Sequence, residues 1–269
     1  MRRIDKKQLA GHFGRRVRSY DAATPVQAHM ASRLVDRARS HFAGQEVTRI
    51  LELGCGTGRM TRQLASAFPQ ARITALDLAP EMIAHARSAL ADVDFVVADA
   101  EVHLQLDSGE YDLIASNAAA QWFDDADTAL ARAHGRLASG GLLAVATFGD
   151  QTFRELRHAF ALAYASIALP EVAHVVAMRS VVDWQRGCPD AEIAEQVTAK
   201  VFPDVVAFLR SVQQAGAVNS LAGVHYLSRS VLREMVRSYT ANYATPARDG
   251  VTATYHTLQL YSAARSIRR

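Results

Sequence analysis

The sequence predicts an α/β fold whose centre is a doubly wound, mostly parallel sheet of seven strands. Short apolar segments with the character of strands alternate with helical segments, and the first of these strands runs directly into a glycine-rich loop. Polar residues follow the next three strands. Alternation of strands with helices of about 10–15 residues is typical of βαβ units, whose strands are parallel.

The first part of the chain has the periodicity of helices. Helical spacing of apolar residues extends over residues 6–20 and again over residues 25–42, and Thr24-Pro25 is a helix-start signal. We therefore predict a helical cap over residues 1–45 that precedes the sheet.

Residues 46–149 are predicted to form the core that binds a cofactor. Strands are expected at residues 48–53, 71–76, 93–97, 111–116 and 142–147. Helices are expected from the glycine loop to residue 68, over residues 80–90 and over residues 124–137, with a turn at Gly140-Gly141 before the last strand.

The regular alternation weakens after Gly149. We expect a lid-like insertion over residues 150–202 and completion of the sheet by residues 203–269. The expected helices cover residues 153–167, 204–215 and 228–239, and the expected strands cover residues 192–202 and 255–263. The pattern of residues 170–188 predicts no element. No internal repeat is visible, and we predict that residues 1–269 form a single domain.

The composition is that of a folded globular protein. Hydrophobic residues make up 49% of the chain and charged residues 21%, which argues against disorder. No apolar run approaches the roughly 20 residues of a membrane span, and the opening MRRIDKKQLAGHF lacks the apolar core of a secretion signal. We therefore expect a cytoplasmic protein without a membrane partner, in which Cys55 and Cys188 are reduced thiols.

The net charge of +3 is unevenly distributed. Before Ser19 the chain has one acidic residue, Asp5, against seven basic ones. The basic residues are Arg2, Arg3, Lys6, Lys7, Arg15, Arg16 and Arg18. A basic arm of this kind suits nucleic acid, a membrane surface or an acidic protein. Because no known nucleic-acid-binding module surrounds it, we expect no nucleic-acid partner.

The strongest local motif is ILELGCGTGRMT at residues 50–61. A strand that runs through glycines into a helix lets the backbone approach a ligand closely, with helix N–H groups directed at negative charge. The nicotinamide fingerprint G-x-G-x-x-G would need a glycine at position 59, which is Arg59. The spacing is instead G-x-G-x-G. Its glycines, with the acid that precedes them, are Glu52, Gly54, Gly56 and Gly58.

Polar residues follow the next three strands. Asp77 ends the second strand, where a carboxylate can accept hydrogen bonds from both hydroxyls of a ribose. Alternatively, Asp77 is the N-cap of the helix that begins at Pro80. Asp99, with Ala100 after it, follows the third strand and is alternatively a turn residue, and Asn117 follows the fourth. This order and spacing place the predicted chemistry at the carboxyl edge of the sheet.

Other catalytic arrangements are missing from the sequence. The ten histidines have no paired ligand spacing and no C-x-x-C is present, so we predict no metal site. The sequence also lacks a G-x-S-x-G elbow and a Walker loop.

The glycine motif resembles motif I of the class I S-adenosylmethionine-dependent methyltransferases, which have a Rossmann-like fold. Further segments resemble the malonyl-[acyl-carrier protein] O-methyltransferase family, among them HFGRRVRSYDAATPVQAHMASRL near the amino terminus and SNAAAQWFDD after the fourth strand. The matching segments are residues 12–34, 116–125, 146–160, 208–220, 227–239 and 253–265. The resemblance covers nearly the whole chain and is weakest at residues 170–195.

This resemblance implies S-adenosylmethionine as the methyl donor and S-adenosylhomocysteine as the product. The motif I loop would receive the aminocarboxylate end of the donor, Asp99 would lie near the adenine amino group, and Asn117 would lie near the reacting sulfonium. The implied donor-binding residues are Tyr20, Gln27, Glu52, Gly54, Gly56, Gly58, Asp77, Leu78, Met82, Asp99, Ala100 and Asn117.

The catalytic residues that the resemblance implies are Tyr20, Asn117 and Trp122. Tyr20 would reach over the donor and help to close the active site, with Gln27 nearby. Alternatively, Tyr20 is an aromatic residue of helix packing. Trp122 would form a wall of the methyl-transfer pocket, or it is simply part of the core.

The implied reaction is methylation of the free carboxylate of malonyl-acyl carrier protein, the step that opens biotin synthesis. A carboxylate is ionised at neutral pH, so the transfer needs no general base and depends on positioning and exclusion of water. An arginine fork or hydroxyl donors suit recognition of the carboxylate. The candidates are Arg154, Arg157, Arg179 and Arg210. The basic amino-terminal arm or these arginines would receive the acidic carrier protein.

Three alternatives remain open. The first is a methyltransferase for a free small acid, of the trans-aconitate type, which shares the motif of residues 116–125 but not the carboxy-terminal matches. The second is a carbon methyltransferase of the quinone-pathway type, which the Gln121-Trp122 pair and the cap disfavour. The third is a non-catalytic module that binds S-adenosylmethionine, against which Asp77 and Asn117 argue.

Overall fold

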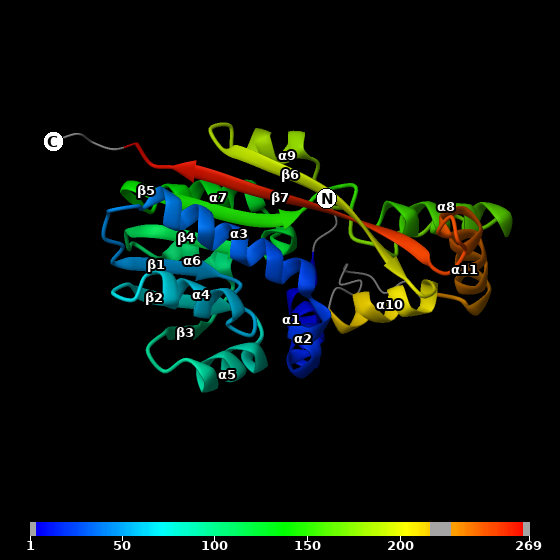
Figure 1. The fold of residues 1–269 in the computed structure, drawn as a ribbon, viewed down its shortest axis with the longest axis horizontal. Helices are drawn as coiled ribbons and strands as arrows, with labels where there is room; N and C mark the ends of the chain where they lie inside the picture. The colour runs from blue at the N-terminus through cyan, green and yellow to red at the C-terminus, as the bar shows by residue number, and fades with distance from the viewer. Residues whose placement is uncertain (1–3, 216–226, 266–269) are drawn as a thin grey trace.

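A computed structural model describes residues 4–215 and 227–265 as one sheet with helices on both faces (Figure 1). The sheet has the order β3-β2-β1-β4-β5-β7-β6, and among these described strands β7 runs opposite to the other six. The strands are β1 (Arg49–Leu53), β2 (Arg72–Asp77), β3 (Asp94–Val97), β4 (Tyr111–Asn117), β5 (Leu137–Phe148), β6 (Glu192–Phe202) and β7 (Val251–Ala263). The prediction of an α/β fold with a mostly parallel, seven-stranded sheet is confirmed.

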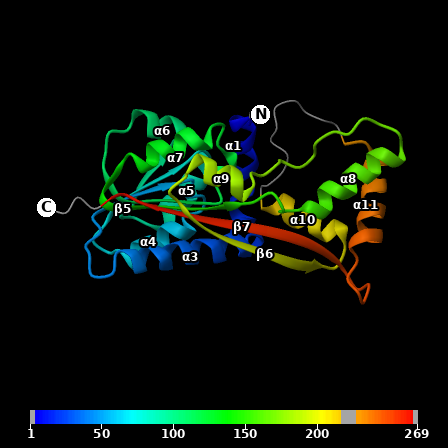
Figure 2. The same cartoon turned by 90° about the horizontal axis from the view of Figure 1, so that it is seen from above.

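Helices pack on both faces of the sheet because successive strand residues alternate between the faces. Ile50 of β1 is buried in the hydrophobic cluster on one face and Leu51 in the cluster on the other. Burial of one such side chain contributes about 1.5–3 kcal/mol. The first face is covered by α3 (Pro25–His41), α4 (Arg59–Ala67) and α5 (Pro80–Ala89). The second is covered by α6 (Ala100–Leu106), α7 (Ala126–His134) and α9 (Val181–Gly187). Figure 2 shows α3 and α4 on one side of the strands and α6, α7 and α9 on the other.

The amino-terminal cap lies against the carboxyl edge of the sheet. It comprises α1 (Lys6–Gly14), α2 (Val17–Ala23) and the start of α3. The single helix expected over residues 6–20 is two helices, because the backbone leaves helical geometry at Arg16, where φ is −107° and ψ is 3°. Thr24-Pro25 begins α3 as predicted, with the proline in its first turn.

The two antiparallel-paired strands reach beyond the rest of the sheet (Figure 1). At about 3.4 Å per residue, the 11 residues of β6 and 13 of β7 make them roughly twice as long as β1, with 5. A second core forms on this extension and includes Phe208, Met235 and Tyr239. It is built by α8 (Arg154–Ser166), α10 (Val205–Gln214) and α11 (Arg229–Tyr243). The expected strand at residues 192–202 is confirmed, and it belongs to the main sheet.

The predicted turn at Gly140-Gly141 is wrong, because both residues lie inside β5. Gly140 has a φ of +77°. A Cβ on Gly141 would lie 2.9 Å from the carbonyl oxygens of Ala138 and Asp112. The glycines therefore permit an irregularity in the strand, next to the point where the register of β4 against β5 shifts.

Several elements differ from the expectation in existence or length. No helix was expected at α6, which Asp99 caps by accepting a hydrogen bond from the Glu101 N–H. The unassigned residues 170–188 contain α9, which begins with a capping box between Ser180 and Asp183. The final strand begins at Val251 rather than at residue 255.

Expectations on the thiols and the basic arm can be compared only with the described residues. Cys55 and Cys188 are free thiols. No helix within residues 4–215 and 227–265 is long and apolar enough to cross a membrane. Arg2 and Arg3 of the basic arm lie outside the residues that the structure describes. The same holds for residues 216–220, the end of the matching segment 208–220.

Candidate functional site

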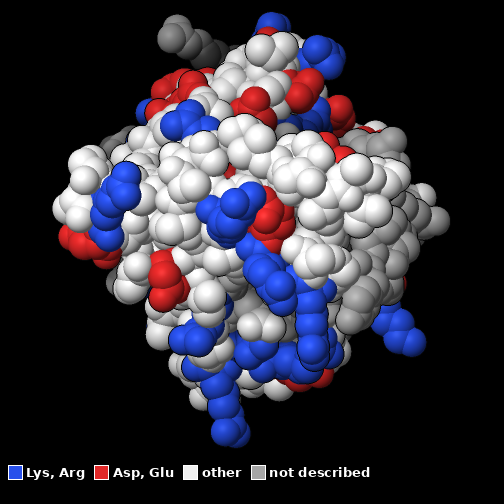
Figure 3. All heavy atoms as spheres, turned by 90° about the vertical axis from the view of Figure 1, so that its right-hand side faces the viewer, with Lys and Arg blue, Asp and Glu red and all other residues white. Residues whose placement is uncertain are grey.

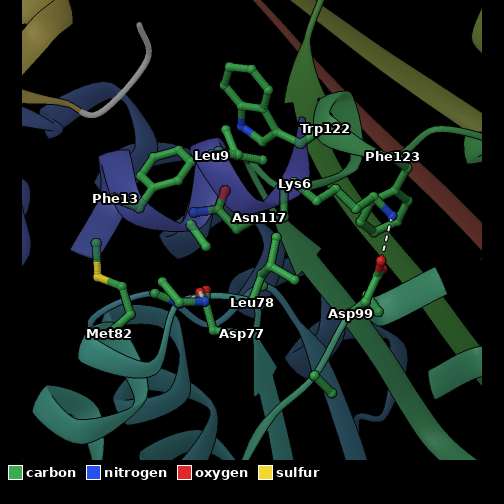
Figure 4. A pocket seen from close by; sticks show the side chains of 18 of the residues that line it. Lys6, Leu9, Phe13, Asp77, Leu78, Met82, Asp99, Asn117, Trp122 and Phe123 are labelled. Atoms are coloured by element: carbon green, nitrogen blue, oxygen red, sulfur yellow. Dashed lines mark hydrogen bonds and ion pairs between the residues drawn. The ribbon is translucent and has the colours of Figure 1, made fainter. Parts of the chain in front are cut away.

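A cavity lies at the carboxyl ends of β1, β2, β3 and β4, under the cap (Figure 4). This is the point where the chain crosses from β2 on one side of β1 to β4 on the other, the usual ligand site of doubly wound sheets. The cavity encloses about 730 Å³ of empty space, part of it open to solvent. We call it the edge cavity. The residues that line it include Lys6, Leu9, Phe13, Tyr20, Gly54, Gly56, Asp77, Leu78, Met82, Asp99, Ala100, Asn117 and Trp122.

A second, larger cavity adjoins the edge cavity and extends toward β6, β7 and α10. We call it the distal cavity; it encloses about 1090 Å³, open solvent included. The two cavities share the side chains of Phe13, Tyr20, Ala118 and Trp122. These residues therefore stand between two spaces, each large enough to hold a small molecule.

The glycine loop is shaped by close packing at the end of β1. Gly54 has a φ of +76°, and a Cβ there would lie only 2.3 Å from the Cβ of Ala119. The N–H groups of Gly54 and Cys55 both donate to the carbonyl of Leu76, at 2.8 Å each. Gly58 lines neither the edge cavity nor the small pocket beneath the loop; it is the N-cap of α4, with a φ of +80°. The backbone of the loop is thus exposed to the cavity as the motif predicts.

Asp77 connects the end of β2 to the glycine loop. Its Oδ2 accepts a hydrogen bond from the Gly56 N–H and its Oδ1 one from the Ala79 N–H, both at 2.8 Å. Burial raises the pKa of Asp77, and these backbone hydrogen bonds oppose that shift. The alternative of a helix N-cap is wrong, because Ala79 is the N-cap of α5.

Glu52 is a buried carboxyl group behind the loop. It is 1% exposed, and its Oε2 has no hydrogen-bond partner among the described residues. Burial, with a further contribution from the charge of Asp77, raises the pKa of Glu52 to about 7. Together with Asn117 and Gln27 it lines a small extension of the edge cavity beneath the loop.

Asn117 connects the end of β4 to the cap. Its Nδ2 donates to the carbonyl of Gln27 at 3.0 Å, across 90 positions of the chain. Its Oδ1 is buried and has no partner within the described part of the chain. An unpaired buried acceptor costs about 1–3 kcal/mol, so this atom needs a donor from a ligand or water.

Three aromatic rings surround the opening between the two cavities. The ring of Phe13 meets those of Tyr20 and Trp122 edge-on, at centroid distances of 6.1 and 6.0 Å. Burial and the nearby charge of Asp77 raise the pKa of Tyr20, so its hydroxyl stays protonated. Trp122 is 8% exposed and packs with Leu9 of the cap.

Lys6 connects the cap to the end of β3. The sequence does not predict this contact, because Lys6 belongs to the basic arm by its position in the chain. Its ammonium group contacts Asp99 at 2.7 Å (Figure 4). It also contacts Glu101. Burial acts to lower the pKa of Lys6, but these two carboxylates raise it overall. Asp99 therefore carries an ion pair and a helix cap at once, so the alternative of a simple turn residue is wrong.

Arg59, the residue that excludes the nicotinamide fingerprint, also holds the cap. It pairs with Asp21 at 3.1 Å and donates to the carbonyl of Thr24 at 2.9 Å. Thr57 of the loop donates to the same Asp21 carboxylate at 2.6 Å. The glycine loop and α2 are thereby fastened together, a role with no local sequence signal.

The four arginines expected to read a carboxylate do not line the edge or the distal cavity. Arg154 and Arg210 are exposed. Arg157 donates to the backbone carbonyls of Thr152 and Asp150. Arg179 pairs with an aspartate at 2.6 Å and lies over the Trp184 ring. These guanidinium groups are occupied or directed elsewhere, so the structure does not bring them to the site.

The fold and the site define a class of protein. Residues 50–141 match the family model described as a methyltransferase domain. The YcgJ protein from Bacillus subtilis is similar with a TM-score of 0.59 and 14% identity, covering 87% of this chain and 99% of that one. The plantazolicin methyltransferase BpumL, solved in complex with SAH, is similar with a TM-score of 0.51 and 14% identity, covering 97% and 95%. The protein is a class I S-adenosylmethionine-dependent methyltransferase.

Full-length sequence similarity is more specific. The malonyl-[acyl-carrier protein] O-methyltransferase of Bacillus anthracis is 34% identical over 267 residues, covering 96% of this chain and 97% of that enzyme. The chain belongs to the malonyl-[acyl-carrier protein] O-methyltransferase family. Within residues 4–215 and 227–265 no cluster of three or more His, Cys, Asp or Glu side chains could hold a metal ion.

Proposed function

We propose that this protein transfers a methyl group from S-adenosylmethionine to the free carboxylate of a malonyl group carried by an acyl carrier protein. The observation that carries the proposal is the pair of adjoining cavities with Tyr20 and Trp122 between them, in a chain of this family. The edge cavity suits the donor, and the distal cavity suits the acyl group.

The edge cavity fits S-adenosylmethionine on three observations. The glycine loop presents backbone where a side chain at Gly54 would collide with Ala119. The unpaired Oδ1 of Asn117 and the unpaired Oε2 of Glu52 are acceptors near the loop, suited to the ammonium group of an amino acid. Asp77, held by two backbone N–H groups, keeps lone pairs for ribose hydroxyls.

The donor would therefore lie along the strand ends. The loop, Glu52, Gln27 and Asn117 would hold its amino-acid end, and Asp77 would hold its ribose. Leu78, Met82 and Ala100 would contact the adenine, with Asp99 beside its amino group although Lys6 already engages that carboxylate. Bound here, S-adenosylmethionine supplies an electrophilic methyl group on a sulfonium.

The residues between the cavities have the chemistry that the transfer needs. The malonyl carboxylate is ionised at neutral pH, so no side chain has to remove a proton. Tyr20, which keeps its proton, can donate a hydrogen bond to the reacting carboxylate. Phe13 and Trp122 exclude water from the same space. We propose that Tyr20, Asn117 and Trp122 act by positioning rather than by acid–base chemistry.

The carrier protein would approach over a basic face. Figure 3 shows lysine and arginine side chains gathered in the lower half of the face where α10 and α11 lie, with few acidic side chains among them. Arg15, which follows α1, and Arg18 of α2 are exposed. Lys6 of α1 is instead engaged in its ion pairs. We propose that the exposed arginines form the docking surface for the acidic partner.

The experiment that tests the function compares possible methyl acceptors by mass spectrometry. Malonyl-acyl carrier protein, free malonate and trans-aconitate are incubated separately with enzyme and S-adenosylmethionine. A mass gain of one methyl ester on the malonyl-acyl carrier protein alone is the expected result. Faster methylation of trans-aconitate would instead support an enzyme for free acids, and no turnover in any arm would contradict the proposal.

A further inference from the structure

The cations that line the cavities differ in whether they have a partner. Lys6 in the edge cavity is paired with Asp99, and Arg59 below the glycine loop is paired with Asp21. Lys200 is the third such cation and lines the distal cavity. It has neither a hydrogen bond nor an ion pair with any residue in 4–215 or 227–265. Among the described residues, Lys200 is therefore a cation at these cavities that has no polar partner and suits a ligand.

The surroundings of Lys200 favour an anion. Lys200 lies on β6 opposite Ala253, and its ammonium group is 5.5 Å from the centre of the Tyr255 ring. The side chain is half-buried, and burial lowers the pKa of Lys200. An anion bound beside it would restore the solvation that the ammonium group has lost and would raise that pKa again.

The composition of the distal cavity supports the same conclusion. None of the described residues that line it is an aspartate or a glutamate. Its other polar residues include Gln27, Gln121, Thr152 and Ser211, all of which are neutral. The described lining, with the Lys200 cation, neutral polar groups and aromatic walls, suits a small anionic group attached to an apolar stem.

We infer that Lys200 pairs with the carboxylate of the acyl group in the distal cavity and thereby selects acidic acyl substrates. This inference rests on the proposed function and assigns the residue that recognises the substrate carboxylate. It replaces the four arginines, which do not line this cavity.

A lysine suits a carboxylate that must itself react. An arginine fork can engage both oxygens of a carboxylate through two parallel hydrogen bonds. An ammonium group is a single point charge and can hold one oxygen while the other faces the methyl group. Lys200 can therefore recognise the charge of the carboxylate and leave its second oxygen free to attack the methyl group.

The test measures how strongly Lys200 and the substrate carboxylate depend on each other. Malonyl-pantetheine and acetyl-pantetheine are titrated by calorimetry into enzyme saturated with S-adenosylhomocysteine, so that no transfer takes place. A hydrogen bond to a charged group gives a preference of about tenfold to hundredfold for the malonyl form. In Lys200→Met this preference should fall to about twofold or less, since the charge is gone.

Controls separate this effect from loss of folding or of general positive charge. Lys200→Gln removes the charge but keeps a polar side chain, and it should lose the preference as Lys200→Met does. Arg72 is 79% exposed and lies at the start of β2, at the end of the strand away from Asp77 and the edge cavity. Arg72→Met removes a positive charge there and should keep the preference for the malonyl form. Melting curves identify any variant that does not fold.

The two levels of the proposal fail in different ways. If the wild-type enzyme does not methylate a malonyl thioester, the proposed function is wrong. If it does so, and both Lys200 variants fold and keep the preference for the malonyl form, the assignment of Lys200 is overturned while the function stands.

Discussion

The Asp77 carboxylate accepts a hydrogen bond from the Gly56 N–H over 2.8 Å, and so joins the end of β2 to the glycine loop that follows β1. Its other oxygen accepts from Ala79 at the same distance. A residue proposed to bind the donor ribose is therefore also part of the framework of the site. Substitution of Asp77 must affect both ligand affinity and stability.

Asp77→Ala should weaken binding of S-adenosylmethionine by about 1.5–3 kcal/mol, the scale of hydrogen bonds to a charged group. It should also lower the free energy of unfolding by about 1–3 kcal/mol, because buried N–H groups lose their acceptor. Calorimetry and denaturant titration measure the two effects. Asp94→Ala, which removes an exposed partner of Arg72, is the control and should change neither. Unchanged donor affinity in folded Asp77→Ala would remove Asp77 from the site.

The buried Glu52 predicts a pH-dependent difference in stability. Burial raises its pKa from 4.5 to about 7, so the folded protein retains a proton that the unfolded chain releases. This group therefore lowers stability progressively as the pH rises from about 4.5 to about 7, and the loss persists above that range. Glu52→Gln removes the effect. As the pH rises from about 4.5 to about 8, the free energy of unfolding of this variant should therefore increase by roughly 3 kcal/mol relative to that of the wild type.

Denaturant titrations of both proteins at the two pH values measure this difference directly. The two proteins differ only at residue 52, so the comparison isolates one carboxyl group. A gap between wild type and Glu52→Gln that does not change with pH would show that Glu52 ionises with an ordinary pKa.

Tyr20→Phe should lower kcat by about tenfold to hundredfold, because it removes one hydrogen bond to a charged reactant. Its hydroxyl has no hydrogen bond to another described residue, so stability should change by less than about 0.5 kcal/mol. Tyr239→Phe is the matched control, since the Tyr239 hydroxyl donates to the Thr252 carbonyl at 2.8 Å in the second core. That variant should lose stability and keep kcat. A fall in melting temperature that accompanies the loss of activity in Tyr20→Phe would favour the packing role.

Reversal of the charges of Arg15, Arg16 and Arg18 to glutamate should lower kcat/KM for malonyl-acyl carrier protein by about tenfold at low salt. Single exposed ion pairs contribute only about 0–1 kcal/mol, so several must act together. Their attraction is screened over about 8–10 Å at physiological salt. Activity on the carrier-bound substrate should therefore fall steeply with ionic strength, while activity on malonyl-pantetheine changes little.

Steady-state kinetics over a salt series measure this dependence. Reversal of three exposed arginines on other faces, Arg39, Arg72 and Arg132, provides the control for net charge. Equal salt sensitivity for the two substrates would leave the exposed arginines without a docking role.

Local patterns predicted most of the elements but not all of their boundaries. Apolar runs and helical spacing predict β1 to β4 and α3 to α5 closely, because each helix buries one face and each strand is buried between the two hydrophobic clusters. Gly140-Gly141 was interpreted as a turn because that pair is frequent in turns, whereas its φ and its close neighbours suit an irregular strand. The short α6 and α9 were missed, since seven residues hold too little periodicity to be recognised.

The sequence by itself predicts that the polar strand ends lie together at one edge of the sheet. Parallel strands end at the same edge of a sheet, so a glycine loop after β1 and polar residues after β2, β3 and β4 must come together there. This holds for Gly54, Asp77, Asp99 and Asn117, which line one cavity. Their order along the chain was sufficient to predict it.

Which charged groups are paired depends on contacts between elements that are far apart in the sequence. Lys6 and Asp99 form an ion pair across 93 positions, and Arg59 joins Asp21 across the junction of cap and loop. Lys200 reaches the distal cavity because β6 extends beyond the parallel strands and packs beside β7. Whether a charged group is neutralised or left for a ligand depends on which distant elements pack against it, and spacing along a single chain does not contain that information.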